Sequence, residues 1–231
     1  MIEANPSASA GWMFSIYLKR LLKKHFFSVR LLGDVPEPAP EHPLLLLPNH
    51  STWWDGFFAW QLNEQLFRRP FYLMMLQEQL QKYTFFRKLG VFGIDPVNPK
   101  GMLSSLNYSV NLLNQLPPPI LTVFPQGELL PTRQSPLGYK KGVDWILKRY
   151  AKPINLLPLA IRCEFTAEQL PLVFFEFGDL INLSSSGFEG IHWLEEQEMD
   201  LLNQLDKRII AGERGLDLMS FSRSNRLERG Q

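Results

Sequence analysis

The amino-acid sequence predicts an α/β domain in which a largely parallel sheet is flanked by helices, preceded by an amphipathic helical segment at the N-terminus. Two observations support this fold class. From residue 44 to residue 211, short apolar runs alternate with stretches of helical periodicity, which is typical of parallel sheets built from βαβ units. The run 44–47 is apolar at every position, as expected for a strand that is buried on both faces.

The N-terminal segment has the periodicity of a helix over residues 9–32. Several residues recur along one side at helical spacings: Trp12, Ile16, Lys19 and Lys23. Within residues 1–33 basic side chains outnumber acidic ones by five to one, and a basic amphipathic helix with aromatic residues can lie in a bilayer interface. The alternative is a helix packed on the domain with its lysines in water. We therefore expect a membrane-associating segment, 1–33, and one larger domain, 34–231, that carries the chemistry.

The remaining elements follow in order along the chain. Prolines between residues 33 and 43 indicate an irregular linker. Apolar runs predict strands at 44–47, 71–75, 91–94, 120–124, 155–161 and 172–177. Helical spacing predicts helices at about 52–68, 103–113, 143–150 and 190–211. Residues 184–187 are expected to form a loop, and the polar stretch after residue 211 an irregular tail.

Composition argues against several classes of protein. The net charge is only +1, whereas nucleic-acid-binding domains usually carry a strong basic excess. The single cysteine, Cys163, allows no internal disulfide and fits a reducing cytosol. His25, His42 and His192 lack ligand-like spacing, so no metal site is expected. No apolar run approaches the ~20 residues of a spanning helix, so we expect a peripheral protein on the cytoplasmic face of a membrane.

Polar residues suited to catalysis follow the predicted strand 44–47. His50 and Asp55 lie just beyond its carboxyl end, where active sites gather in open α/β sheets. Imidazole is the usual general base near neutral pH, and a carboxylate on its second nitrogen fixes the tautomer. The two can meet if His50 precedes the next helix and Asp55 lies in its first turn, with Ser51 or Thr52 as the cap. The alternative is a surface histidine bonded to a helix cap.

Two further strand ends carry polar residues. Asp95 follows the run 91–94, and Gln126, Gly127 and Glu128 follow the run 120–124. Gly127 allows a sharp turn or a close approach of the backbone to a ligand. Taken alone, this segment also fits a β-turn with a solvated glutamate.

Taken together, these segments resemble the glycerolipid acyltransferase family, which includes the 1-acylglycerol-3-phosphate acyltransferases. Asn49, His50 and Asp55 match the family's Asn-His-x4-Asp motif. Residues 90–96 are similar to its second block. Residues 124–128 are similar to the third, usually Phe-Pro-Glu-Gly-Thr-Arg, and residues 157–161 to the fourth, a Val-Pro-Val-Ala-like strand. Their order and spacing agree from about residue 44 to residue 161.

The resemblance implies a glycerol-3-phosphate acyltransferase-like fold and the transfer of a fatty acyl group to a lipid hydroxyl. His50 is then the general base, Asp55 orients it, and the donor is a thioester of coenzyme A or acyl-carrier protein, with no further cofactor. Backbone donors near Gly127 are expected to stabilise the oxyanion. Residues in or beside the blocks are expected to bind the substrate: Asn49, Asp95, Gln126, Gly127, Glu128 and Arg133.

The sequence also departs from the family pattern. Pro96 and Leu129 stand where the family has basic residues thought to hold the phosphate of the acceptor. Three basic residues of the following loop could replace them: Arg133, Lys140 and Lys141. The simpler interpretation is an acceptor without a phosphate there, such as a glycolipid or glycosylated terpenoid. The alternatives are 1-acylglycerol-3-phosphate as the acceptor, a thioesterase or lipid hydrolase, and a non-catalytic lipid- or acyl-carrier-binding protein.

Overall fold

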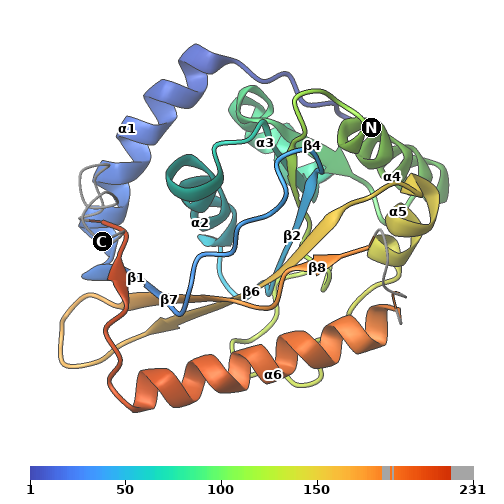
Figure 1. The fold of residues 1–231 in the computed structure, drawn as a ribbon. Coiled ribbons are helices and arrows are strands. Elements are labelled where there is room, and N and C mark those ends of the chain that lie inside the picture. Colours follow the sequence, from blue (N-terminus) through green and yellow to red (C-terminus); the bar gives the residue numbers. More distant parts are fainter. Residues whose placement is uncertain (184–187, 189, 220–231) are drawn as a thin grey trace.

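The computed structural model describes residues 1–183, 188 and 190–219 (Figure 1). Its strands are β1 (Ser28–Leu32), β2 (Leu44–Pro48), β3 (Phe71–Leu76), β4 (Val91–Ile94), β5 (Ile120–Thr122), β6 (Asn155–Glu164), β7 (Leu172–Phe177), β8 (Ile181–Asn182) and β9 (Leu216–Asp217). Its α-helices are α1 (Ala8–His25), α2 (Asp55–Leu62), α3 (Gln77–Lys82), α4 (Pro99–Leu113), α5 (Gly142–Tyr150) and α6 (Ile191–Ile210). A π-helical turn, Asn63–Phe67, continues α2, and a 3₁₀ segment, Thr84–Leu89, precedes β4.

The strands of the described residues form one sheet in the order β4-β3-β5-β2-β6-β7-β1-β9, and β8 pairs with β6. The strands from β4 to β6 run parallel to one another, and β1 runs parallel to β7. The pairs β6–β7, β6–β8 and β1–β9 are antiparallel. The predicted α/β fold with a largely parallel sheet flanked by helices is therefore confirmed.

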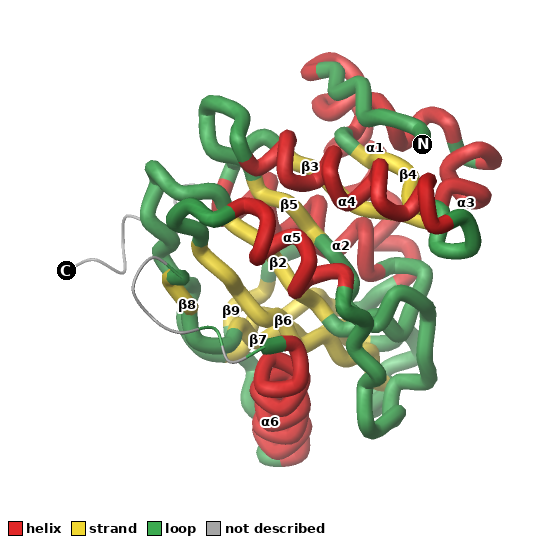
Figure 2. The backbone as a smooth tube through the Cα atoms, turned by 90° about the vertical axis from the view of Figure 1, so that its right-hand side faces the viewer, coloured by secondary structure: helices red, strands yellow, loops and turns green. Residues whose placement is uncertain are grey.

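Helices cover both faces of the sheet (Figures 1 and 2). On one face, α1 and α2 pack with the strands around Phe14, Leu18 and Phe58. On the other face, α4, α5 and α6 pack around a second apolar cluster that includes Leu106 and Ile146. Figure 2 shows α4 and α5 lying across the sheet on the viewer's side, with α6 standing beside β6 and β7. This burial on both sides explains why the run 44–47 is apolar throughout.

The N-terminal segment differs from the prediction in its second half. α1 ends at His25, and residues 28–32 form β1 instead of continuing the helix. Val29 and Leu32 are completely buried there, and periodicity alone cannot distinguish a short apolar strand from a buried helix. Since β1 pairs with β7, residues 28–32 are part of the same sheet as the rest of the chain; the division at residue 33 stays a prediction.

The other predicted strands and helices are present, with small shifts at their ends. The helix predicted from residue 52 begins at Asp55 and changes to a π-helical turn at Asn63. The short elements α3, β8 and β9 were not predicted, because a few residues carry too little periodicity. The loop predicted at 184–187 and the tail beyond residue 219 lie outside the described residues.

The site is positioned by the central strands of this sheet. β2 and β5 are parallel neighbours, with Leu44 opposite Ile120 and Leu46 opposite Thr122. Their carboxyl ends therefore lie at one edge, which is where open α/β sheets bind ligands. The turn that begins at Asn49 and the segment that follows Thr122 emerge there side by side.

Candidate active site

Asn49 extends the pairing of β2 with β6 by one residue beyond the strand. Its side-chain amide donates to the carbonyl oxygen of Ile161 at 3.2 Å, and its Oδ1 accepts from the Ile161 N–H at 2.7 Å. Its own N–H donates to the carbonyl oxygen of Leu159 at 3.3 Å. Asn49 is 2% exposed, and these contacts fix the start of the turn that carries His50.

His50 and Asp55 meet in the way the sequence predicts. His50 lies in the turn after β2, Asp55 is the first residue of α2, and His50 Nδ1 lies 2.9 Å from Asp55 Oδ2. Because an ionised carboxylate only accepts hydrogen bonds, Nδ1 carries the proton of the neutral imidazole and Nε2 keeps its lone pair. The His50 side chain is 21% exposed and the Asp55 side chain is fully buried. The imidazole is thus accessible to a ligand, while the carboxylate that orients it is buried.

Three other donors hold the Asp55 carboxylate. The N–H groups of Ser51 and Thr52 donate to Oδ2 at 2.8 and 2.9 Å, and the Thr52 hydroxyl donates to Oδ1 at 2.5 Å. Such bonds offset the large cost of burying a charge. The regular part of α2 begins after Trp54, whose own side chain makes no capping bond. The Thr52 hydroxyl accepts from the Trp54 N–H at 3.2 Å, so Thr52 makes the kind of bond expected of the predicted cap, and Ser51 and Thr52 also wrap the turn around the carboxylate.

The segment after β5 holds His50 from the other side. Gln126 Oε1 accepts a hydrogen bond from the His50 N–H, and the Leu130 N–H donates to the His50 carbonyl oxygen at 3.0 Å. The ring of Phe124 stacks on the imidazole, with 4.0 Å between centroids and 19° between planes. Gln126 is 2% exposed and supports the backbone of His50. Its predicted role in substrate binding therefore has no geometric support.

His50 lines an apolar cavity of about 660 Å³, a size within the usual range for small-molecule sites. Its lining comes from both sides of the sheet, with Phe14 and Trp60 from α1 and α2, and Leu106 and Ile146 from α4 and α5. Cavities with apolar walls and a few convergent polar groups suit apolar ligands with one polar end. The reactive end of such a ligand would lie at His50.

Glu128 and Lys140 form an ion pair at this cavity, with 3.2 Å between the carboxylate and the ammonium nitrogen. Both side chains are more than half exposed. Gly127 has a φ of +73°, and a Cβ there would lie 3.2 Å from Lys140 Cγ, so the glycine makes room for the lysine chain. The Lys140 N–H donates to the carbonyl oxygen of Pro125 at 2.8 Å. Lys140 thus contacts the third motif block, residues 124–128, although it lies 12 residues beyond the end of that block.

The amide donors of this turn are only partly available to an oxyanion. The Gly127 N–H donates to the carbonyl oxygen of Phe124 at 3.0 Å, so it closes the turn. The next amide, that of Glu128, has no acceptor among the described residues. We therefore predict that the oxyanion donor expected near Gly127 is the N–H of Glu128.

Four of the six expected substrate-binding residues lie outside the cavity lining: Asn49 and Gln126, described above, and Asp95 and Arg133. Asp95 Oδ1 accepts from two backbone N–H groups of the turn that leads into α4, at 3.2 and 3.3 Å. Arg133 pairs with Glu164 and Asp206 at 3.0 and 2.9 Å. Of the three basic residues considered as phosphate ligands, Lys140 alone appears in the described lining. Substrate binding by Asp95 and Arg133 stays a prediction without support from the geometry.

Cys163 is poorly suited to be a nucleophile, although it lies near Asp55. Burial raises the pKa of its thiol to about 11, and the negative charges of Asp55 and Glu164 add to the increase. Because the thiolate is the reactive form of cysteine, the protonated thiol is inert at neutral pH. The imidazole of His50 remains the group that can activate an attacking oxygen.

A histidine held by a buried carboxylate, beside an apolar cavity, is an arrangement suited to activating a hydroxyl group next to an apolar substrate. A comparison with protein families points in the same direction: the family described as acyltransferase matches residues 22–162, which is more than half of the 231-residue chain. The chain belongs to the acyltransferase family and is an acyltransferase enzyme. The resemblance predicted from the motif blocks is confirmed.

A solved structure shares the fold. The crystal structure of the 1-acyl-sn-glycerophosphate (LPA) acyltransferase, PlsC, from Thermotoga maritima is similar with a TM-score of 0.58 and 16% sequence identity. The similarity covers 85% of this chain and 79% of that one. A search of curated proteins gave no match.

Proposed function

We propose that the protein is an O-acyltransferase that moves a fatty acyl group from acyl-coenzyme A or acyl-carrier protein to a lipid hydroxyl. The observation that carries this proposal is the position of His50, whose imidazole is oriented by Asp55 and lines the apolar cavity. The proposed step needs only the thioester donor and the lipid acceptor, without a cofactor.

In the proposed reaction, His50 Nε2 takes the proton of the acceptor hydroxyl while the oxygen attacks the thioester carbonyl carbon. The charge on the carbonyl oxygen is stabilised by the N–H of Glu128. When the tetrahedral intermediate collapses, the C–S bond breaks and the imidazolium returns the proton to the leaving thiolate. An ester and a free thiol result, and Asp55 stabilises the imidazolium throughout.

The cavity supports a substrate with an alkyl chain. Each methylene group buried there contributes about 0.8 kcal/mol, so a long chain can be bound by its length alone. Because residues on both sides of the sheet line the cavity, it offers apolar surface to the acyl chain of the donor and to the acceptor. Both would meet at His50.

Product analysis tests the proposal. Purified protein is incubated with isotope-labelled acyl-coenzyme A and a panel of lipid acceptors, and the products are identified by mass spectrometry. A new ester is expected. Free fatty acid alone would show a thioesterase or lipid hydrolase, and the absence of any product would favour a non-catalytic binding protein.

For the acceptor, we propose a lipid without a phosphate near the reacting hydroxyl, such as a glycolipid or glycosylated terpenoid. Leu129 lines the cavity and is 52% exposed, at the position where the resemblance places an arginine. Lys140 is neutralised by Glu128, and a phosphate at a partly desolvated site needs charged donors. The second candidate is 1-acylglycerol-3-phosphate, which Lys140 favours as the one basic side chain in the described lining, His50 aside.

In a competition at equal concentrations, a neutral lipid alcohol or glycolipid is expected to be acylated faster than lysophosphatidate. Glu128→Gln should shift the product ratio toward phosphatidate by a factor of about 2 to 5, the range expected from an exposed ion pair, because it leaves Lys140 with an unbalanced charge. Glu78→Gln is the matched control, since Glu78 pairs with Lys82 at 3.0 Å outside the cavity lining. Preferential formation of phosphatidate by the unmodified protein would contradict the proposed acceptor.

We propose that the protein binds the cytoplasmic face of a membrane. None of the described helices is long and apolar enough to cross a bilayer. α1 instead exposes large apolar side chains, Trp12, Met13 and Tyr17, by 68, 63 and 56%. The cavity also has an apolar rim, which consists of the partly exposed lining residues Trp53, Leu76, Tyr83 and Leu129. Trp and Tyr suit the interface because each has an apolar body and a polar tip.

Ring contacts connect α1 to this apolar rim. Tyr17 contacts Phe14, Phe14 contacts Phe57, and Phe57 contacts Trp53, with ring centroids 4.6 to 6.2 Å apart. The exposed side of α1 and the cavity rim are therefore connected through Phe14, which is buried, and Phe57, which is partly buried. We propose that the exposed Tyr17 and Trp53 at the two ends of this connection both contact the bilayer.

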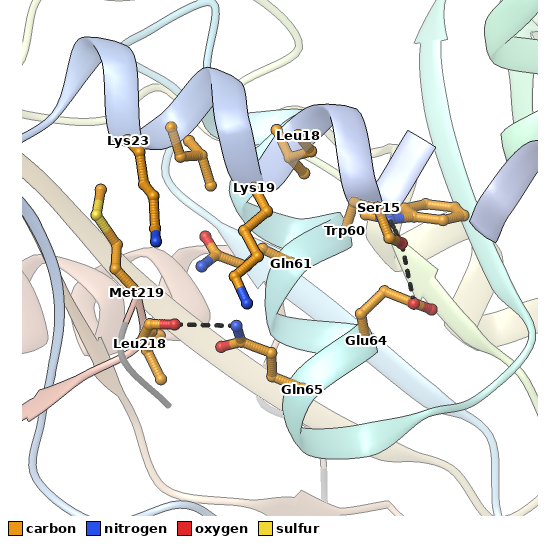
Figure 3. Close-up of a pocket in the computed structure, with 11 residues that line it drawn as sticks. Ser15, Leu18, Lys19, Lys23, Trp60, Gln61, Glu64, Gln65, Leu218 and Met219 are labelled. Atoms are coloured by element: carbon orange, nitrogen blue, oxygen red, sulfur yellow. Dashed lines mark hydrogen bonds between the residues drawn. The ribbon is translucent and has the colours of Figure 1, made fainter. Parts of the chain in front are cut away.

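Removing two positive charges from α1 should weaken binding to anionic vesicles. Figure 3 shows Lys19 and Lys23 reaching over a pocket between α1 and α2, whereas helical spacing places Arg20 and Lys24 with the exposed Tyr17. The Arg20→Gln/Lys24→Gln variant is expected to bind about 30-fold less tightly, since each charge near the surface contributes ~1 kcal/mol.

Co-sedimentation with vesicles that contain anionic lipid measures this effect. Lys148→Gln/Arg149→Gln is the control, because these exposed residues lie on α5, on the opposite face of the sheet. An equal loss of binding in both variants would contradict a specific role for α1, and so would unchanged binding in both. Point substitutions are preferable to deletion of residues 9–32, which would also remove β1 from the sheet.

A further inference from the structure

α6 places a carboxyl group beneath the turn that carries His50. Glu198 is fully buried, and neither of its carboxylate oxygens has a hydrogen-bond partner among the described residues. The carboxyl group faces the backbone N–H groups of Asn49 and Leu159. Asn49 is the residue before His50, and Leu159 is its partner on β6. A completely buried acid at this junction has no part in the proposed reaction and needs another explanation.

The groups around Glu198 leave it without a counterion of its own. Arg162 of β6 faces it, but the guanidinium is bound to Asp206, with 2.7 Å between Nε and Oδ1. The Tyr139 hydroxyl is buried near Glu198 and has no partner in the described part of the chain. Glu195, one turn earlier on α6, accepts from the Gly138 N–H at 2.6 Å. The charges that face Glu198 are therefore either paired elsewhere or of the same sign.

Burial consequently keeps the Glu198 carboxyl group mostly protonated at pH 7. It raises the pKa of the Glu198 carboxyl from 4.5 to about 8, and the attraction of Arg162 and the nearby N–H groups opposes this only in part. The protonated carboxyl group still offers a carbonyl oxygen as an acceptor and one O–H donor. It can lie against these backbone N–H groups without placing a charge under the active site.

We infer that Glu198 is a positioning residue, whose buried carboxyl group packs against the backbone of Asn49 at the end of β2 and thereby holds His50 in line with the cavity. The inference rests on the proposed acyl transfer for its effect on turnover. Small displacements matter at such a site, because a shift of about 1 Å can cost ~10²-fold in rate. Ionisation of Glu198 would place an unpaired charge at the junction and disturb it.

Two substitutions separate positioning from a merely structural role. Glu198→Gln keeps the shape and the acceptor oxygen of the neutral acid, so its kcat at pH 7 should stay close to that of the unmodified protein. Glu198→Leu removes the polar group that faces the Asn49 and Leu159 N–H groups and should lower kcat by about 10- to 100-fold, with little change in KM because the cavity lining is untouched. Glu196→Gln, on the exposed side of α6, is the control and should change neither.

The pH dependence supplies a second measurement. Because the pKa of Glu198 in the folded protein, about 8, lies above its ordinary value of 4.5, its contribution to stability is fully present below pH 4.5. That contribution is lost as the pH rises through about 8. The melting temperature and kcat of the unmodified protein should both decline toward alkaline pH, and Glu198→Gln should flatten both curves. If Glu198→Leu does not fold, the comparison of Glu198→Gln with the unmodified protein is decisive. The inference is overturned if the melting temperature and kcat of Glu198→Gln decline toward alkaline pH as strongly as those of the unmodified protein.

The NMR signals of the His50 imidazole provide a test that does not depend on turnover. The signals are assigned by their loss in a His50→Gln variant. They should shift in Glu198→Leu and stay in place in Glu198→Gln. A folded Glu198→Leu protein with unchanged His50 signals and normal kcat overturns the inference. Shifted signals in a protein that forms no ester would instead support the positioning role and reject the proposed acyl transfer.

Discussion

Replacement of His50 by alanine is expected to abolish acyl transfer and leave the fold intact. Loss of a general base typically lowers the rate by ~10²–10⁴. The fold should survive because Gln126 and Leu130 bind the backbone of His50, whose N–H and carbonyl groups remain in the variant. The measurement is the rate of ester formation from acyl-coenzyme A, together with the melting temperature.

His192→Ala is the control for this experiment. The His192 side chain is 85% exposed and lies on α6 outside the cavity lining, so its removal should change neither rate nor stability. The His50→Ala protein should still bind the acyl donor, since the apolar lining is unchanged. A folded His50→Ala protein with near-normal turnover would exclude His50 as the base.

Replacement of Asp55 by asparagine is expected to reduce the rate about as strongly, by ~10²–10⁴, because the wrong tautomer of His50 is then favoured. It should also lower stability. Asp55 Oδ2 accepts from His50, Ser51 and Thr52, and Oδ1 accepts from the Thr52 hydroxyl. An asparagine has one acceptor oxygen, so its NH₂ group must face at least one of these donors. Each buried group left unsatisfied costs about 1–3 kcal/mol.

Thr52→Val provides the comparison. It removes the hydroxyl, which donates to Asp55 Oδ1 and accepts from the Trp54 N–H, and leaves the bond between His50 and Oδ2 in place. We expect it to lower the melting temperature and to change kcat much less than Asp55→Asn does. Near-normal turnover in a folded Asp55→Asn protein would show that His50 does not need this carboxylate.

The sheet and the pairing of His50 with Asp55 were predictable because their signals are local. An unbroken apolar run marked β2, and the next residues placed an imidazole and a carboxylate at its carboxyl end. The four motif blocks then narrowed the chemistry to one family. β1 was missed because its five residues carry too little periodicity to distinguish a strand from the end of the preceding helix.

The residues that support His50 depend on contacts between distant parts of the chain. Gln126 and Leu130 reach His50 from the segment after β5, and Lys140 arrives from a later loop. No pattern in the sequence indicates these contacts. Glu198 is an exception, because it interrupts the apolar side of α6 between Leu194 and Leu201, both of which are buried. A carboxylate at a core-facing helical position is rare unless it is paired, and that signal alone could have identified it.

Isotope labelling of the acceptor hydroxyl tests the proposed acyl transfer most directly. The unmodified protein is supplied with acyl-coenzyme A and a lipid acceptor whose reacting hydroxyl carries heavy oxygen, and products are followed by mass spectrometry with a parallel thiol assay. We expect an ester that retains the heavy oxygen, released with an equal amount of free thiol, and neither product from His50→Ala. Free fatty acid that has taken its oxygen from water, with no labelled ester, would contradict the account.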